Sequence, residues 1–155
     1  MLIDLPTAKL QASIDADADD ALITIYIGAA ERFAAEYLQR NIYADQEALT
    51  TAVAAAHAAF ATATAAYSAA MVLAEALDAG EGREMAVFAA FDALCRARQA
   101  ARMTHQGIVL NDTIKAAMLL IIGHLYANRE DTVVGVSIAE LPMGSRYLLD
   151  TIRAY

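Results

Sequence analysis

The chain has 155 residues, which suits one domain or one domain with an appendage. Hydrophobic residues make up 59% and charged residues 19%, a composition that allows a sizeable core and argues against a disordered chain. The net charge of −8 disfavours binding to nucleic-acid phosphates or anionic lipid, because both need clustered Lys and Arg. The single cysteine, Cys95, cannot form an internal disulfide, which indicates a reducing compartment.

No signal peptide and no membrane span are expected. The N-terminal sequence lacks a basic segment followed by a long apolar one. The longest apolar stretch, residues 116–126, is far shorter than the ~20 residues that a membrane span needs.

The N-terminal part predicts two helices. The first is short, at residues 8–12, with Thr7 as its cap and with Leu5 and Leu10 facing inward. The second runs over residues 19–40, because apolar side chains recur there at steps of three and four residues. Its expected inner face comprises Leu22, Ile25, Ala29, Phe33, Glu36 and Tyr37, widened by Ile23, Tyr26, Ile27 and Ala30.

Four aspartates precede the second helix: Asp15, Asp17, Asp19 and Asp20. A calcium-binding EF-hand loop would need glycine at its sixth position and glutamate at its twelfth. Counted from Asp15, those positions hold Asp20 and Tyr26, so the pattern fails. The cluster is instead expected to cap the helix, where carboxylates favour the positive end of the helix dipole.

Residues 44–104 differ in character, since about two in five of them are alanine, the strongest helix former. Two antiparallel helices are predicted, over residues 45–79 and 83–105, with a turn at Gly80 and Gly82. The first arm contains a heptad seam: Leu49, Val53, Ala56, Phe60, Ala63, Tyr67, Ala70, Ala74 and Leu77. The second arm offers Met85, Phe88, Phe91, Leu94 and Cys95. An arm of this length spans ~50 Å, so the hairpin is expected to project or to pack against a neighbouring chain.

A third core helix is predicted from Asn111 or Asp112 to about Arg129, with one of the first two as its cap. Its broad apolar face comprises Ile114, Ala117, Met118, Ile121, Ile122, Leu125 and Tyr126. Residues 132–139 are β-branched and indicate an extended loop or a short strand, and residues 141–144 indicate a turn. A short terminal helix should follow at residues 145–152.

Two groups of residues stand in an order and spacing typical of one protein family. The N-terminal group comprises residues 5–10, Ile14-Asp15, Ala21-Leu22-Ile23, Tyr26-Ile27, Ala29-Ala30-Glu31, Tyr37-Leu38 and Arg40. The C-terminal group comprises Ile114-Lys115-Ala116-Ala117, Leu119-Leu120, His124-Leu125-Tyr126, Asn128-Arg129-Glu130, Leu141-Pro142-Met143-Gly144, Arg146, Leu148-Leu149 and Arg153-Ala154-Tyr155. Together they resemble the head–tail connector family (adaptor or DNA-packaging proteins) of tailed phages.

The resemblance divides the chain into two parts. Residues 1–43 and 108–155 are expected to form the connector core, an all-α bundle of about three helices plus the short terminal helix. Residues 44–107 are an inserted Ala-rich αα-hairpin, a departure from the family, whose members commonly join these helices by a short linker.

The resemblance implies a structural role and no catalysis. The family forms a homo-oligomeric ring of about a dozen subunits beneath the portal, extends the DNA channel and docks the next head-completion or tail protein. An acidic channel would let DNA pass without specific binding. The expected location is the virion head–tail junction, after assembly in the bacterial cytoplasm. The contact surface is expected in the C-terminal segment, at Arg129, Glu130, Val133, Val134, Pro142, Met143, Arg146 and Tyr155.

The chain shows no sequence signature of an active site, a cofactor or a metal. The three histidines, His57, His105 and His124, stand at no metal-ligand spacing, and no phosphate-binding glycine pattern occurs. Arg96, Arg98 and Arg102 form a small basic patch, which can pair with Glu75, Asp78 or Glu84 of the hairpin or contact an acidic neighbouring subunit.

Two other functions are open at this point. The first is a small helical binding module, a chaperone or regulator that uses the hairpin to grip a partner helix. The second is an enzyme built on a helical bundle, for which no acid–base pair or metal cluster can be named.

Overall fold

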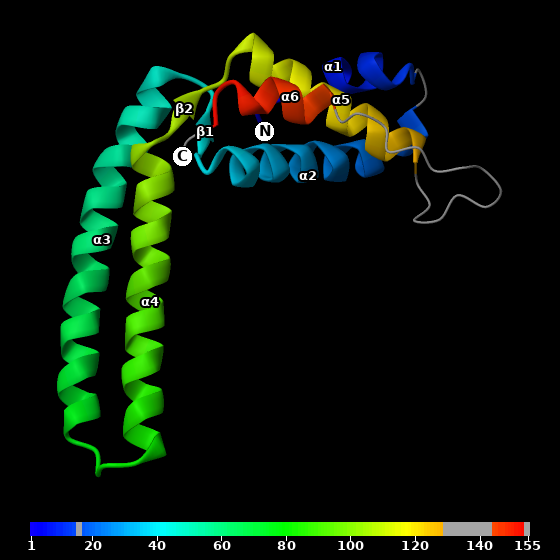
Figure 1. The fold of residues 1–155 in the computed structure, drawn as a ribbon. Coiled ribbons are helices and arrows are strands. Elements are labelled where there is room, and N and C mark those ends of the chain that lie inside the picture. Colours follow the sequence, from blue (N-terminus) through cyan, green and yellow to red (C-terminus); the bar gives the residue numbers. More distant parts are fainter. Residues whose placement is uncertain (15–16, 129–143, 154–155) are drawn as a thin grey trace. The chain divides into compact units, whose positions relative to one another are not determined.

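The computed structural model describes residues 1–14, 17–128 and 144–153 (Figure 1). The elements in chain order are α1 (Leu5–Ala12), η1 (Asp17–Asp19), α2 (Asp20–Leu38), β1 (Ile42–Tyr43), α3 (Gln46–Glu75), α4 (Glu81–His105), β2 (Ile108–Val109), α5 (Asp112–Ala127) and α6 (Gly144–Asp150). The predicted all-α fold class is confirmed, and the described strands are two residues each. The predicted loop at residues 132–139 and nearly all of the turn at 141–144 lie outside the described residues.

The chain divides into two units by the density of its own contacts. The first, here called the core unit, comprises Met1–Ala44 and Ile108–Tyr155. The second, the hairpin unit, comprises Asp45–Gly107 and holds α3 and α4.

The core unit packs α1, α2, α5 and α6 around one apolar cluster, since each helix alone would leave an apolar stripe in water. Its buried members are Ile3, Ala8, Ile23, Ile27, Ala30, Ala34, Leu38, Ile114, Ala117, Met118, Ile122 and Leu149. The N-terminal residues are fastened to α2, because the backbone N–H groups of Leu2 and Ile3 donate to the Glu31 carboxylate.

Two predictions for the first helices are wrong in detail. The first helix begins at Leu5, not at Ala8, and Leu10 is 81% exposed. In α2 the buried side chains include Ile23 and Ile27, which had been expected only to widen the inner face. Ile25, which had been expected on the inner face itself, is 65% exposed. Both stripes fit a helical period, so only packing against α5 and α1 selects between them.

The predictions for the later core helices are confirmed. Asn111 caps α5, because its side-chain oxygen accepts a hydrogen bond from the Ile114 N–H at 2.9 Å. Four of the predicted α5 positions are fully buried: Ile114, Ala117, Met118 and Ile122. The short terminal helix, α6, buries Leu149 in the same cluster.

A pair of very short strands joins the two ends of the core unit that flank the hairpin. β1 and β2 pair in parallel, with Ile42 opposite Ile108 and Tyr43 opposite Val109. The chain therefore leaves the core unit and returns to it at adjacent points. The sequence does not predict this pair of strands, because two residues are too few to form a periodic pattern.

The hairpin unit is an antiparallel pair of long helices, as predicted (Figure 1). Asp45 caps α3 by accepting a hydrogen bond from the Ala48 N–H at 2.8 Å. The predicted seam of α3 faces α4 at most positions, and Ala74 is only 1% exposed. Gly80, at a φ of +155°, precedes α4, while Gly82 lies inside that helix.

The sequence prediction for α4 named apolar residues but assigned no inner seam to this helix. Alternating steps of four and three residues lead through its shielded positions: Arg83, Val87, Ala90, Leu94, Ala97, Ala101 and Thr104. Of the apolar residues named for this arm, Leu94 lies in the seam, whereas the others are exposed: Met85, Phe88, Phe91 and Cys95. Small side chains on both seams let the two helices approach closely, and the large apolar ones of α4 remain outside.

Among the described helices, α3 is long and apolar enough to cross a membrane by length and composition. The sequence of α3 contains no long uninterrupted apolar run, because threonine, serine and histidine divide its alanines. Composition alone is weak evidence for a span, and α3 packs along α4 through its heptad seam.

Candidate assembly interface

The C-terminal helix is held on α2 by an aromatic and polar cluster. The Tyr37 hydroxyl donates a hydrogen bond of 2.6 Å to the Asp150 carboxylate, which raises the pKa of Tyr37 above its ordinary value. The Arg153 guanidinium lies 4.9 Å from the centre of the Tyr37 ring, and Phe33 stacks on the same ring. Because the contacts of Tyr37 with Asp150 and Arg153 join residues more than 110 positions apart, the sequence holds no local signal for them.

The end of α5 is also defined by its own side chains. The Asn128 side-chain amide donates to the backbone carbonyl of His124 at 2.9 Å, and the Asn128 N–H donates to the same carbonyl. Along the chain, residues 129–143 follow α5 and precede α6, and they lie outside the described residues.

Of the predicted contact residues, the structure describes one. Arg146 is exposed on α6, and its positive charge, like the larger effect of Arg153, lowers the pKa of Tyr37 without cancelling the rise caused by the Asp150 hydrogen bond. The others lie outside the described residues: Arg129, Glu130, Val133, Val134, Pro142, Met143 and Tyr155.

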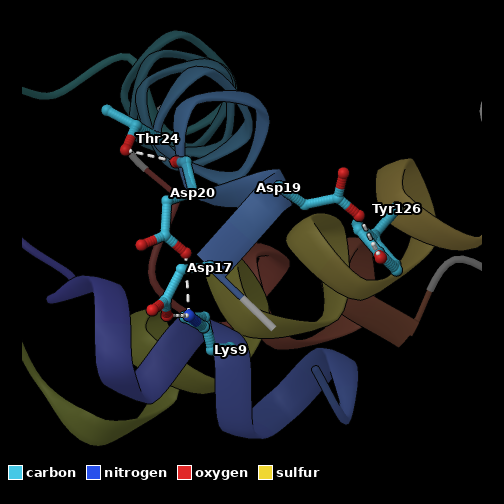
Figure 2. Close-up of polar contacts among 6 residues, drawn as sticks. All are labelled: Lys9, Asp17, Asp19, Asp20, Thr24 and Tyr126. Atoms are coloured by element: carbon cyan, nitrogen blue, oxygen red, sulfur yellow. Dashed lines mark hydrogen bonds and ion pairs between the residues drawn. The ribbon is translucent and has the colours of Figure 1, made fainter. Parts of the chain in front are cut away.

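The acidic cluster at the start of α2 places Asp20 in the first turn, as the predicted interaction with the helix dipole requires, but it also makes contacts that were not predicted (Figure 2). Asp19 stands at the cap position, but its carboxylate makes no capping hydrogen bond. It accepts instead from the Tyr126 hydroxyl of α5, at 2.6 Å. Lys9 of α1 forms ion pairs with Asp17 at 2.7 Å and with Asp20 at 2.8 Å. The described aspartates therefore tie α1, α2 and α5 together, and Asp15 lies outside the described residues.

The hairpin unit brings two histidines together that the sequence keeps 48 positions apart. The rings of His57 on α3 and His105 on α4 meet edge to face, with centroids 4.5 Å apart. No third potential ligand joins them, since the described residues contain no group of three His, Cys, Asp or Glu side chains that could hold a metal ion. Arg96 pairs with Asp92 at 2.7 Å on the same helix, not with the acidic residues considered from the sequence.

The described residues define an all-α chain with a packed helical core, in which charged side chains join helices that are distant in the sequence. Comparison with known families identifies the class more closely. The sequence profile of the phage gp6-like head-tail connector proteins matches residues 2–78. The chain belongs to the head–tail connector family, a family of structural phage proteins of the virion head–tail junction.

The extent of the match differs from the resemblance described above. It includes the N-terminal group of residues and continues through α3, a helix that sequence analysis had assigned to the insertion. It does not extend to the C-terminal group. No curated protein and no solved structure matches the chain significantly.

Proposed function

We propose that the chain is an adaptor subunit that forms a closed ring beneath the portal of a tailed phage. In this role it extends the DNA channel and docks the next head-completion or tail protein. The observation that carries the proposal is the family match over residues 2–78, together with the all-helical core unit. The subunit performs no catalysis and needs no cofactor.

A ring requires contacts between different faces of identical subunits that close by rotation, here with about a dozen copies. The core unit suits this role, because the ion pairs of Lys9 and the hydrogen bond of the Tyr126 hydroxyl join its helices. Its outer surface also exposes large apolar side chains that a neighbouring subunit can cover: Met1, Leu10, Ile25, Leu120 and Tyr147.

The C-terminal segment is the proposed surface for the portal and for the next protein. It comprises Arg129, Glu130, Val133, Val134, Pro142, Met143, Arg146 and Tyr155. Arg146 supports this assignment because its side chain is exposed, on a helix that Leu149 anchors in the core cluster.

DNA passes through the ring without specific binding. The net charge of −8 repels phosphates and keeps the nucleic acid from adhering during packaging and ejection. The subunit assembles in the bacterial cytoplasm and remains at the virion head–tail junction.

The test is to incubate the purified chain with isolated portal rings and to measure mass by native mass spectrometry, followed by electron microscopy. We expect a ring of about a dozen copies bound to the portal. Arg146→Glu should weaken binding, whereas the matched charge reversal Arg96→Glu, on the exposed surface of α4 in the hairpin unit, should not. A chain that stays monomeric in the presence of portal at all concentrations contradicts the proposal.

A further inference from the structure

The outward surface of α4 carries a second heptad stripe, separate from the seam that faces α3. Alternating steps of four and three residues connect its members, so they share one face of the helix. We call this set the outer stripe: Glu84, Phe88, Phe91, Cys95, Arg98 and Arg102.

Nothing within the described chain covers the outer stripe. Phe88 is 64% exposed and Phe91 55% exposed, although aromatic side chains of this size are usually shielded in a single folded chain. Glu84, Arg98 and Arg102 are exposed and form no ion pair with another described residue. A shallow hollow beside the stripe, at the hairpin turn, is lined by Glu84, Phe88 and Phe91 among others.

The residues of the outer stripe are arranged symmetrically about its midpoint, and residues at equal distances on either side of the midpoint attract one another. Position 93 is its midpoint, since Glu84 and Arg102 lie nine residues away on opposite sides. Phe88 and Arg98 lie five residues from that midpoint, and Phe91 and Cys95 lie two. One half of the stripe is therefore acidic and aromatic, and the other half is a thiol followed by two guanidinium groups.

We propose that the outer stripe is the docking surface for a second copy of this chain, with the two α4 helices antiparallel about a two-fold axis at position 93. In such a pair each residue of the stripe meets its mirror position: Glu84 faces Arg102, Phe88 faces Arg98 and Phe91 faces Cys95. These are the pairings of alternating heptad positions that antiparallel coiled-coil packing requires. Because the contact is isologous, every pairing occurs twice.

Each layer of this contact joins groups that attract one another. Glu84 and Arg102 form an ion pair, and the guanidinium of Arg98 lies over the Phe88 ring, where the face of the aromatic system is negative. Phe91 and Cys95 form an apolar centre, since a free thiol packs like a small hydrophobic group. The hollow at Glu84 and Phe88 receives the long arginine side chains of the second copy.

Other arrangements leave these groups unpaired. Glu84 and Arg102 of one helix are 18 residues, and therefore ~27 Å, apart, so they cannot pair within one chain. A parallel pair of α4 helices would place glutamate against glutamate and arginine against arginine, which is repulsive. Charge complementarity therefore selects a second copy in the antiparallel orientation.

This contact does not depend on the proposed ring. A ring uses different faces of each subunit, whereas the outer stripe joins copies in pairs only. A single helix face is small for an interface, so we expect weak, concentration-dependent association. The two proposals are also separable by mass, because one predicts pairs and the other about a dozen copies.

The test is sedimentation of the full chain over a range of concentrations, with variants at the ends of the stripe. Glu84→Arg and Arg102→Glu should each weaken pairing about tenfold, because both ion pairs become repulsive. The double variant should restore the original dissociation constant, since arginine then faces glutamate again. Glu75→Arg, an exposed charge reversal outside the stripe, is the matched control. A double variant as weak as either single one overturns the proposal.

A cross-linking experiment tests the register independently. In Phe91→Cys the new thiol faces Cys95 of the second copy, so mild oxidation should yield a covalent dimer that reducing agent dissolves. Met85→Cys places its thiol on another face of α4 and should yield no more dimer than the unmodified chain. Equal yields from the two variants, or covalent ladders longer than two copies, overturn the antiparallel register.

Discussion

At the scale of single residues, charged and aromatic side chains fasten helices that are distant in sequence. Asp19 and Tyr126 are 107 positions apart, yet their hydrogen bond joins the start of α2 to α5. Tyr37 and Asp150 do the same for α2 and α6. The aspartates resemble a capping cluster in the sequence, but their partners are side chains of other helices, which no local pattern reveals.

Lys9 gives the core unit a predictable dependence on pH. Its hydrogen bond lowers the pKa of Asp17, and Asp17 in turn raises the pKa of Lys9. The contribution of Asp17 to stability is therefore complete above the ordinary aspartate pKa, and it is lost as the pH falls through the lowered value. On the alkaline side, the contribution of Lys9 is lost as the pH rises through its raised pKa.

We predict that Lys9→Met lowers the melting temperature at neutral pH by about one or two degrees, because Asp17 is exposed and solvent screens the pair. The difference from the unchanged chain should shrink between about pH 5 and pH 2, as Asp17 takes up a proton. Thermal melts followed by circular dichroism measure both effects. Arg32→Met, which breaks a fully solvated ion pair, is the control. A difference that is constant over this range would contradict the assignment.

At the scale of elements, the hairpin depends on close approach of small side chains. Ala74 on α3 and Ala90 on α4 are its two buried residues among those described. Threonine and serine hydroxyls along α3 donate to backbone carbonyls four residues earlier, so these polar groups need no tertiary partner. The stability of the hairpin should therefore depend on the volume of the seam side chains more than on their polarity.

We predict that Ala74→Leu destabilises the hairpin by about 1–3 kcal/mol, because the larger side chain forces the two helices apart. Ala69→Leu adds the same volume to the same helix at an exposed position and should change stability by less than about 0.5 kcal/mol. Urea unfolding followed by circular dichroism gives both values. Equal effects of the two substitutions would show that Ala74 does not lie in a close-packed seam.

At the scale of the whole molecule, we propose that the core and hairpin units are separate domains. The parallel pair of β1 and β2 places the exit and the return of the chain side by side. With strands ~4.8 Å apart and a rise of ~3.3 Å per residue, Ala44 and Ile108 are ~8 Å apart. A short linker can therefore replace the hairpin without strain.

Deleting residues 45–107 and inserting about four Gly/Ser residues should leave a helical core that unfolds cooperatively. The connector proposal expects this shortened chain to bind portal rings still, whereas a binding module that grips its partner with the hairpin would lose its activity. Circular dichroism and the portal-binding assay measure the two outcomes. A shortened chain without helical structure would show that the units do not fold separately.

The sequence by itself determined the helices, several of their ends and the seam of α3. Heptad spacing in α3, the cap at Asn111 and the apolar face of α5 are local patterns, and the structure retains all three. The order of short motifs was also enough to identify the connector family.

Tertiary structure decided which of two periodic faces of α2 is buried, and it turned the large apolar residues of α4 outward. It also paired β1 with β2, His57 with His105, and Tyr126 with Asp19. These outcomes depend on which of several helix faces packs against a given neighbouring element. A helix offers several faces of similar hydrophobicity, and the free energy that selects one of them comes from side chains far away in the sequence.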